Sequence, residues 1–165
     1  MYKKIIFGVL LVLFFSCKEN ANTIEQANSS AFNITTDKWP KKVVVNSKAT
    51  NILKDWPEFN ALETSIEAFY TVENKEDLNL VLDDVVEKQK LLAASKYPND
   101  FNVAQIKSRQ KVFHTFLLKI KGNIEYDVEV QEPFLDMMNA HNDLLNQFNI
   151  ITNRLDINTL LDEEE

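Results

Sequence analysis

The sequence contains few of the residues that build tight turns, disulfide bonds or metal sites. Its 165 residues include one Cys, two Gly, four Pro and two His. Sandwiches and barrels of strands need frequent turns built with Gly and Pro, so this composition argues against them and favours helices. A single Cys also excludes a disulfide framework and a multi-cysteine zinc site.

Positive charge is scarce as well. The chain has 18 Lys and Arg against 25 Asp and Glu, which gives a net charge of −7. This balance argues against nucleic acid as a partner. Apolar residues make up 45% of the chain, which is enough for a core and excludes a wholly disordered protein.

Motifs of catalysis and cofactor binding are missing. Neither His has a Glu three residues before it, as a ferritin-like metal site requires. The chain has no haem-attachment motif, no Gly-rich phosphate loop and no Gly-x-Ser-x-Gly elbow. We therefore predict no catalysis, no metal and no cofactor, with His141 a neutral, hydrogen-bonded core residue and His114 a solvated flank residue.

The longest apolar run lies at the N-terminus. Lys3 and Lys4 precede a stretch from Ile5 to Phe15 that is apolar apart from Gly8. This run is too short to span a bilayer, which needs about 20 helical residues. A basic start followed by a short apolar run is typical of a secretory signal. The run ends in the sequence Phe14-Phe15-Ser16-Cys17.

That ending resembles the lipobox of bacterial lipoproteins. The resemblance implies that residues 1–16 are a signal peptide, that Cys17 receives a lipid, and that the new amine is acylated. Because Lys18 rather than Asp follows the Cys, it also implies transfer to the outer membrane, facing the periplasm or the cell surface. The alternative is an ordinary signal peptide cut near Cys17, or a short anchor.

Residues 17–45 are predicted to be a lipidated flexible tether. Asn, Thr, Ser, Ala and Gln dominate residues 20–36, and such a composition cannot bury enough surface to fold. Near the end of this stretch, Trp39-Pro40 and the run 43–45 are expected to dock onto the domain edge. Residues 158–165 are predicted to be an acidic tail.

The stretch between them, residues 46–157, carries apolar residues at alternating spacings of three and four, which is the periodicity of amphipathic helices. The four stripes run from Phe59 to Phe69, Leu78 to Leu92, Val103 to Ile124 and Phe134 to Leu155. A shorter helix is expected just before them, over 49–56. Because short connections make sequential helices antiparallel neighbours, we predict an all-α fold, an up-and-down antiparallel bundle of about four helices with a short N-terminal helical addition.

Polar residues refine this prediction. Gln89 and Gln110 stand in register within the second and third apolar stripes. Asn74 is expected to cap the second helix, and Asn102 to begin a capping box with a Gln three residues later. Gly122 is a candidate end for the third helix.

The third predicted helix contains no acidic residue between Val103 and Gly122. Its cations are Lys107, Arg109, Lys111, Lys119 and Lys121. These residues form a candidate anion-binding face for phosphorylated lipid or acidic glycan. The alternative is internal complementarity, in which they pair with the acidic second helix.

Asparagine recurs along the fourth predicted helix. The residues are Asn139, Asn142, Asn146, Asn149 and Asn153. Asn is a mediocre helix former, and its amide offers donors and acceptors without charge, so this stripe is a candidate polar ligand face for a glycan or a partner helix. The alternative is that an exposed face inherits an asparagine-rich composition.

Together these features predict a lipid-anchored cell-envelope protein that acts as a non-catalytic binding or scaffolding module. Its partners are membrane lipid, through acylated Cys17, and a protein or glycan. The alternative is a periplasmic chaperone-like or immunity-type lipoprotein, in which the acidic domain binds a basic protein partner.

Overall fold

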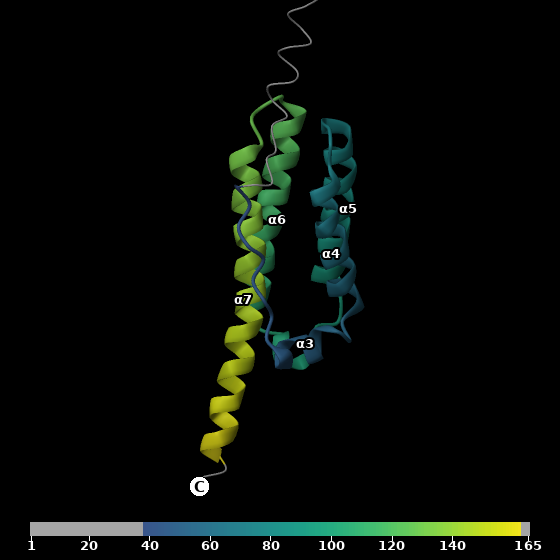
Figure 1. The fold of residues 1–165 in the computed structure, drawn as a ribbon. Coiled ribbons are helices and arrows are strands. Elements are labelled where there is room, and N and C mark those ends of the chain that lie inside the picture. The colour runs from purple at the N-terminus through teal and green to yellow at the C-terminus, as the bar shows by residue number, and fades with distance from the viewer. Residues whose placement is uncertain (1–37, 163–165) are drawn as a thin grey trace, which may run out of the picture. The chain divides into compact units, whose positions relative to one another are not determined.

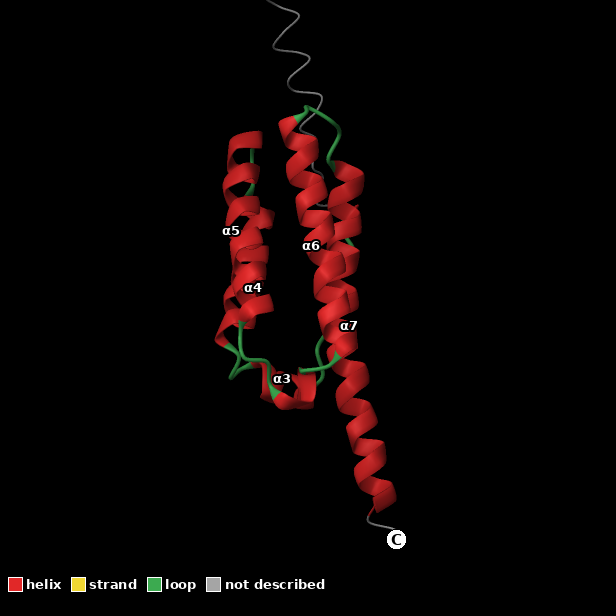
Figure 2. Ribbon diagram, turned by 180° about the vertical axis from the view of Figure 1, so that it is seen from behind, coloured by secondary structure: helices red, strands yellow, loops and turns green. Residues whose placement is uncertain are grey.

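The computed structural model describes residues 38–162, with side chains described as far as Leu155. Within this range every regular element is a helix and none is a strand (Figure 2). The predicted all-α class is confirmed. Cys17 and the predicted signal peptide lie outside the described residues.

Five α-helices follow one another along the described chain, and they coincide with the five predicted helical segments. They are α3 (Ser47–Leu53), α4 (Pro57–Glu67), α5 (Lys75–Ala94), α6 (Ala104–Glu125) and α7 (Gln131–Asp162). The 3-10 turns η3 (Ala68–Thr71) and η4 (Asn99–Phe101) extend α4 and precede α6. Helix α7 continues past residue 157, where the predicted domain ended.

The long helices pack as a helical bundle. Helix α4 packs on α5, α5 on α6, and α6 on α7, while α3 lies across one end and contacts α7 (Figure 1). The packing follows from the apolar stripes, because each helix buries only the face that carries its stripe. The core that results is rich in aromatic side chains.

Phe148 of α7 is at the centre of an aromatic cluster. Its ring centroid lies 4.6 Å from that of Phe101 and 5.4 Å from that of Phe59, and Trp56 packs on the same group at 6.5 Å. Phe148 and Phe113 are both completely buried. The apolar spacing predicted both residues for the core.

The helix boundaries agree with the sequence in one place and differ in two. Asn74 caps α5, since its side chain accepts a hydrogen bond from the backbone N–H of Asp77 at 2.8 Å. The capping box at Asn102 is wrong, because Asn102 closes the turn η4 and α6 begins after Val103, which makes no side-chain cap. Gly122 does not end α6. The chain turns at Asp127 instead, with a φ of 51°, a left-handed conformation that Asp tolerates better than most residues.

An extended segment precedes α3. We call residues 39–46 the strap. It runs beside α7 (Figure 1) and ends at Asn46, the N-cap of α3. Trp39 stacks on Phe134 at 4.7 Å and meets the Tyr70 ring edge-on at 4.5 Å, and Val43 is partly buried against the core. The predicted docking is confirmed for Trp39, Val43 and Val45, whereas the Val44 side chain is exposed. Residues 39–45, predicted to be flexible tether, are held against the bundle.

Candidate functional site

The asparagine stripe of α7 holds the strap. Asn142 accepts a hydrogen bond from the Val43 N–H at 2.9 Å and donates one to the Lys41 carbonyl at 2.9 Å. Two turns later, Asn149 accepts from the Asn46 N–H at 2.8 Å and donates to the Val44 carbonyl at 2.9 Å. Each amide thus binds one N–H and one C=O of the strap, as a neighbouring strand would.

The rest of the stripe is divided. Asn153 accepts a hydrogen bond from the Asn46 side chain at 3.3 Å. Asn139 and Asn146 are exposed, and neither makes a side-chain hydrogen bond within the described residues. The structure therefore brings three of the five predicted residues to the strap and leaves Asn139 and Asn146 facing solvent.

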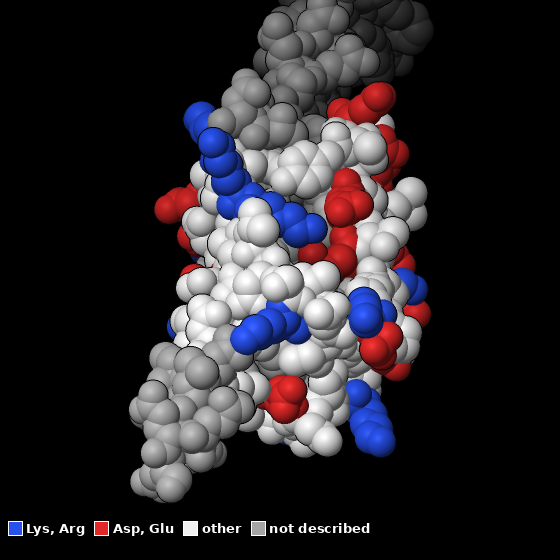
Figure 3. Space-filling view, turned by 60° about the horizontal axis from the view of Figure 1, so that its bottom comes forward, with Lys and Arg blue, Asp and Glu red and all other residues white. Residues whose placement is uncertain are grey.

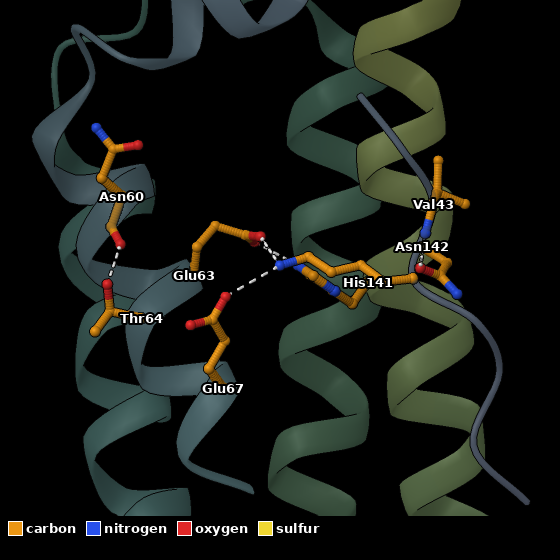
Figure 4. Close-up of polar contacts among 8 residues, drawn as sticks. Val43, Asn60, Glu63, Thr64, Glu67, His141 and Asn142 are labelled. Carbon is orange, nitrogen blue, oxygen red and sulfur yellow. Dashed lines mark hydrogen bonds and ion pairs between the residues drawn. The ribbon is translucent and has the colours of Figure 1, made fainter. Parts of the chain in front are cut away.

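A charged cluster fixes the strap to α4 and α7. Lys42 of the strap lies 2.9 Å from one carboxylate oxygen of Glu63, and His141 Nε2 lies 2.5 Å from the other (Figure 4). The His141 side chain is 2% exposed and that of Glu63 is 17% exposed. The predicted burial and hydrogen bonding of His141 are confirmed.

The ionisation of this cluster is set by pairing rather than by burial. Burial alone would raise the pKa of Glu63, but the hydrogen bond and charge of His141, together with Lys42, hold that pKa below its usual value. Burial alone would lower the pKa of Lys42, yet the carboxylates of Glu63 and Glu67 raise it. The cluster is a structural clamp, and the described residues contain no group of acidic, His or Cys side chains arranged to hold a metal.

The cations of α6 are divided between two environments. Three of them pair with carboxylates of neighbouring helices. Arg109 lies 3.4 Å from Asp143 and Lys119 lies 3.9 Å from Asp136, both on α7. Lys121 pairs with Asp83 of α5. Internal complementarity therefore explains these three, although α7 rather than α5 supplies two of the partners.

Such pairs contribute little stability. Each is largely exposed, and exposed pairs contribute about 0–1 kcal/mol. Charges of both signs are interspersed over the face of the bundle toward α3 (Figure 3). Pairing of this kind is ordinary for charges on a protein surface. The two remaining cations of α6, Lys107 and Lys111, have no ion pair within the described residues.

Lys107 and Lys111 face a pocket between α5 and α6. The pocket has a volume of about 490 Å³, within the range of about 300–1,000 Å³ that is usual for small-molecule sites. Its polar lining consists of Gln89, Lys90, Tyr97, Lys107, Gln110, Lys111, His114 and Thr115. Two cations of the predicted anion-binding face are thus joined by Lys90, which the sequence did not single out.

Two buried amides form the floor of this pocket. Gln89 and Gln110 are each 2% exposed. Gln89 donates from Nε2 to the Gln110 carbonyl at 3.2 Å, and the Tyr97 hydroxyl donates to Gln110 Oε1. Among the residues that line the pocket, three buried atoms have no hydrogen-bond partner within the described chain, namely Gln89 Oε1, Gln110 Nε2 and His114 Nδ1. An unmatched buried polar atom costs about 1–3 kcal/mol, and these three atoms are buried beneath the surface of the pocket rather than exposed in it.

The mouth of the pocket is cationic. Lys90, Lys107 and Lys111 are exposed and have no ion pair within the described residues. Among the described residues, no Asp or Glu lines the pocket. Lys107 Nζ lies 5.1 Å from the centre of the Tyr97 ring. Burial, and then the charge of Lys90, lower the pKa of His114, so His114 is neutral at neutral pH.

Two glutamines in the apolar stripes of the sequence mark the position of the pocket. A Gln within an apolar stripe is unusual, since Gln is rarely buried. Gln89 and Gln110 occupy such positions on two neighbouring helices, so they meet where α5 packs on α6. The prediction for His114 is corrected: it is partly buried in the pocket wall because its helix face turns toward α5 rather than fully into solvent.

Comparisons with protein-family models, with curated proteins and with solved structures found no match to this chain. In the part of the chain that the structure describes, no helix is long and apolar enough to cross a bilayer. The function is therefore inferred from the pocket and from the N-terminal motif.

Proposed function

We propose that the protein is a lipid-anchored cell-envelope module that binds a small ligand without catalysis. The pocket between α5 and α6 carries this proposal, because it combines a volume of about 490 Å³ with three lysines that have no carboxylate among the described lining residues. Within the described part of the chain, no carboxylate lines the pocket. His114 therefore lacks the acid that orients the base in a nucleophile–base–acid triad. Binding is the chemistry that these side chains support.

The anchoring part rests on the sequence Phe14-Phe15-Ser16-Cys17 and its resemblance to a lipobox. Two or three acyl chains on Cys17 would hold the protein on the membrane, since stable anchoring takes more than one chain. The strap would then be the point at which the tether meets the bundle. The proposed location is the outer membrane, facing the periplasm or the cell surface.

We further propose an up-and-down antiparallel arrangement for α4, α5, α6 and α7, with α3 as the short N-terminal addition. Its support is that helices adjacent in sequence also pack together. The connections between them are short, as this topology requires. In this arrangement the pocket lies between two successive helices and shares no residue with the strap.

The test of a binding function is the retention of a small molecule by the pocket. Ala93 is exposed and lines the pocket, so Ala93→Phe should fill the pocket without disturbing the core. Ala94 is the matched control, because it is also exposed but does not line the pocket. The full chain and both variants are purified from the envelope, and small molecules released on denaturation are identified by mass spectrometry.

We expect at least one compound to accompany the native chain and Ala94→Phe but to be absent from Ala93→Phe. The same compounds in all three samples, or none in any of them, would contradict a ligand-binding role for the pocket.

A further inference from the structure

We propose that the ligand of this pocket is an organic anion with an apolar body, in which an acidic head is joined to a carbon skeleton that carries few other polar groups. This inference rests on the proposed binding function and names the class of ligand. Three features of the described lining support it, namely its charge, the engagement of its neutral polar groups, and the volume that it encloses.

The acidic head follows from the charge of the lining. Lys90 comes from α5, whereas Lys107 and Lys111 lie one turn apart on α6, so cations line both walls. Like charges at this helical spacing repel one another, and no carboxylate of the described lining offsets them. All three lysines are exposed, so an acidic head placed among them stays in contact with solvent and avoids the desolvation cost of a buried charge. A carboxylate and a phosphate both meet this requirement, because a lysine ammonium acts as a compact point charge.

The neutral polar groups of the lining are already engaged. The Tyr97 hydroxyl donates to Gln110 Oε1, and the Thr115 hydroxyl donates to the Lys111 carbonyl at 2.9 Å. The unmatched amide atoms of the two glutamines lie beneath the pocket surface, where a ligand does not reach them. The described lining therefore gives a ligand little neutral hydrogen bonding. A body rich in hydroxyl groups would lose its hydrogen bonds to water there without replacing them.

The lining offers carbon instead. The Ala93 methyl group, the Tyr97 ring and the side-chain stems of the lysines border the opening. The pocket has a volume of about 490 Å³, and an inorganic anion, whose size is closer to that of a water molecule at about 30 Å³, would leave most of it empty. An acid whose head stays at the mouth can place an apolar body against these carbon atoms, and removing that surface from water is favourable.

A set of small compounds separates the head from the body. Acetate, benzoate and 2-naphthoate share a carboxylate and differ in the size of the apolar body. Benzamide is the neutral isostere of benzoate, and glucuronate joins a carboxylate to a body covered with hydroxyl groups.

The binding of each compound is followed by NMR on the full chain in detergent micelles, labelled with ¹³C in its alanine methyl groups. The Ala93 methyl signal reports on the pocket. The Ala49 methyl signal is the internal control, because Ala49 is buried in the core and does not line the pocket. Free concentrations are measured by equilibrium dialysis, so that partition into micelles is not counted as binding.

We expect the affinity to rise from acetate to benzoate to 2-naphthoate, with benzoate about ten-fold tighter than acetate because of the apolar surface that it buries. Glucuronate should bind as weakly as acetate. Benzamide should bind about ten-fold more weakly than benzoate, since it loses its contacts with three ammonium groups. An affinity that does not grow with the apolar body, or benzamide or glucuronate binding as tightly as benzoate, would overturn the proposed ligand class.

An acidic head on an apolar body occurs both in compact organic acids and in membrane lipids. Phenyl phosphate and dihexanoyl phosphatidate carry a phosphate head on one ring and on two acyl chains, so they distinguish these sources. We expect phenyl phosphate to bind more tightly, because the volume of the pocket is that of a small-molecule site. Tighter binding of dihexanoyl phosphatidate would support the same class of ligand and identify a membrane lipid as its source.

Two variants connect the head to the lysines. Lys111→Gln should weaken benzoate binding by about three-fold and leave benzamide binding unchanged, because only the charged head depends on the lysine. Lys119→Gln is its matched control, because Lys119 lies on the same helix but pairs with Asp136 and does not line the pocket. It should leave both compounds unchanged. Equal benzoate affinity in the two variants would contradict the proposed place of the acidic head.

The ligand class and the binding function fail on different results. If the compound series contradicts the class while a retained compound is still lost from Ala93→Phe, the binding function stands and only the ligand class fails. If the pocket retains nothing and no compound shifts the Ala93 methyl signal, the proposed function itself fails.

Discussion

Replacement of Asn149 by Ala should release one end of the strap and destabilise the protein. The side chain makes two hydrogen bonds to strap backbone, at 2.8 and 2.9 Å. At about 0.5–1.5 kcal/mol each, their loss removes about 1–3 kcal/mol of stability. Alanine is a better helix former by up to about 0.7 kcal/mol, which offsets part of that loss. The net decrease in the free energy of unfolding should be about 0.3–3 kcal/mol.

Asn146 provides the matched control. It lies three residues earlier on the same helix, is exposed, and makes no side-chain hydrogen bond within the described residues. Asn146→Ala should therefore leave the free energy of unfolding unchanged or raise it by up to about 0.7 kcal/mol. The comparison of the two variants cancels helix propensity and isolates the contacts with the strap.

The measurement is urea unfolding of the full chain and both variants, followed by far-ultraviolet circular dichroism. Asn149→Asp adds a third point, since it keeps the acceptor for the Asn46 N–H but loses the donor to the Val44 carbonyl. It should fall between the native chain and Asn149→Ala. If Asn149→Ala and Asn146→Ala are equally stable, the amides do not hold the strap and the reasoning is wrong.

Four further outcomes are expected. Cys17→Ala should block lipidation and cause the unprocessed chain to accumulate, and radiolabelled palmitate in this variant would contradict the assignment. Phe148→Ala should lower the free energy of unfolding by about 3–5 kcal/mol, because a completely buried ring is removed; an unchanged urea midpoint would contradict the packing. Glu63→Gln should be less stable than the native chain at neutral pH. Since pairing lowers the pKa of Glu63 in the fold, its contribution is present above the unfolded pKa of about 4.3 and is lost as the pH falls through the folded pKa. The difference between the two chains should close in acid, and one that persists at pH 2 would refute this account. The affinity of the pocket for an organic carboxylate, with benzoate as the probe, should rise as the pH falls below about 6.5, because the pKa of His114 is lowered and its protonation adds a positive charge to the pocket while the lysines stay charged. If the affinity of His114→Asn depends on pH to the same extent, a group other than His114 causes the effect.

The helices were predictable because their cause is local. Alternating spacings of three and four residues place apolar side chains on one face, whatever that face packs against. Phe113 and Phe148 could therefore be placed in the core before any partner was known. The boundaries were less predictable, because a cap competes with adjacent turns. Asn102 has the right side chain for a cap, but its backbone closes the turn η4 and α6 starts after it.

The strap was only partly predictable because its partners are distant in sequence. Val43 and its acceptor on Asn142 are 99 residues apart. An extended segment has no internal hydrogen bonds that a local pattern could reveal. The asparagine stripe was visible as an excess of poor helix formers on one helix. The sequence could not show that three of the five asparagines bind the strap, a segment of the same chain.

Distance in sequence also explains why the cations of α6 could not be assigned to their two environments from the sequence. Lys111 and Lys119 are alike in the sequence of α6, yet Lys119 reaches a carboxylate on α7 while Lys111 faces α5 at a point where no acid is present. An exposed pair adds little stability, so the unpaired lysines are not costly by themselves. Their position is the informative feature. They surround an opening of about 490 Å³ between α5 and α6. An anion that entered this opening would meet three ammonium groups with no carboxylate of the described lining to compete for them.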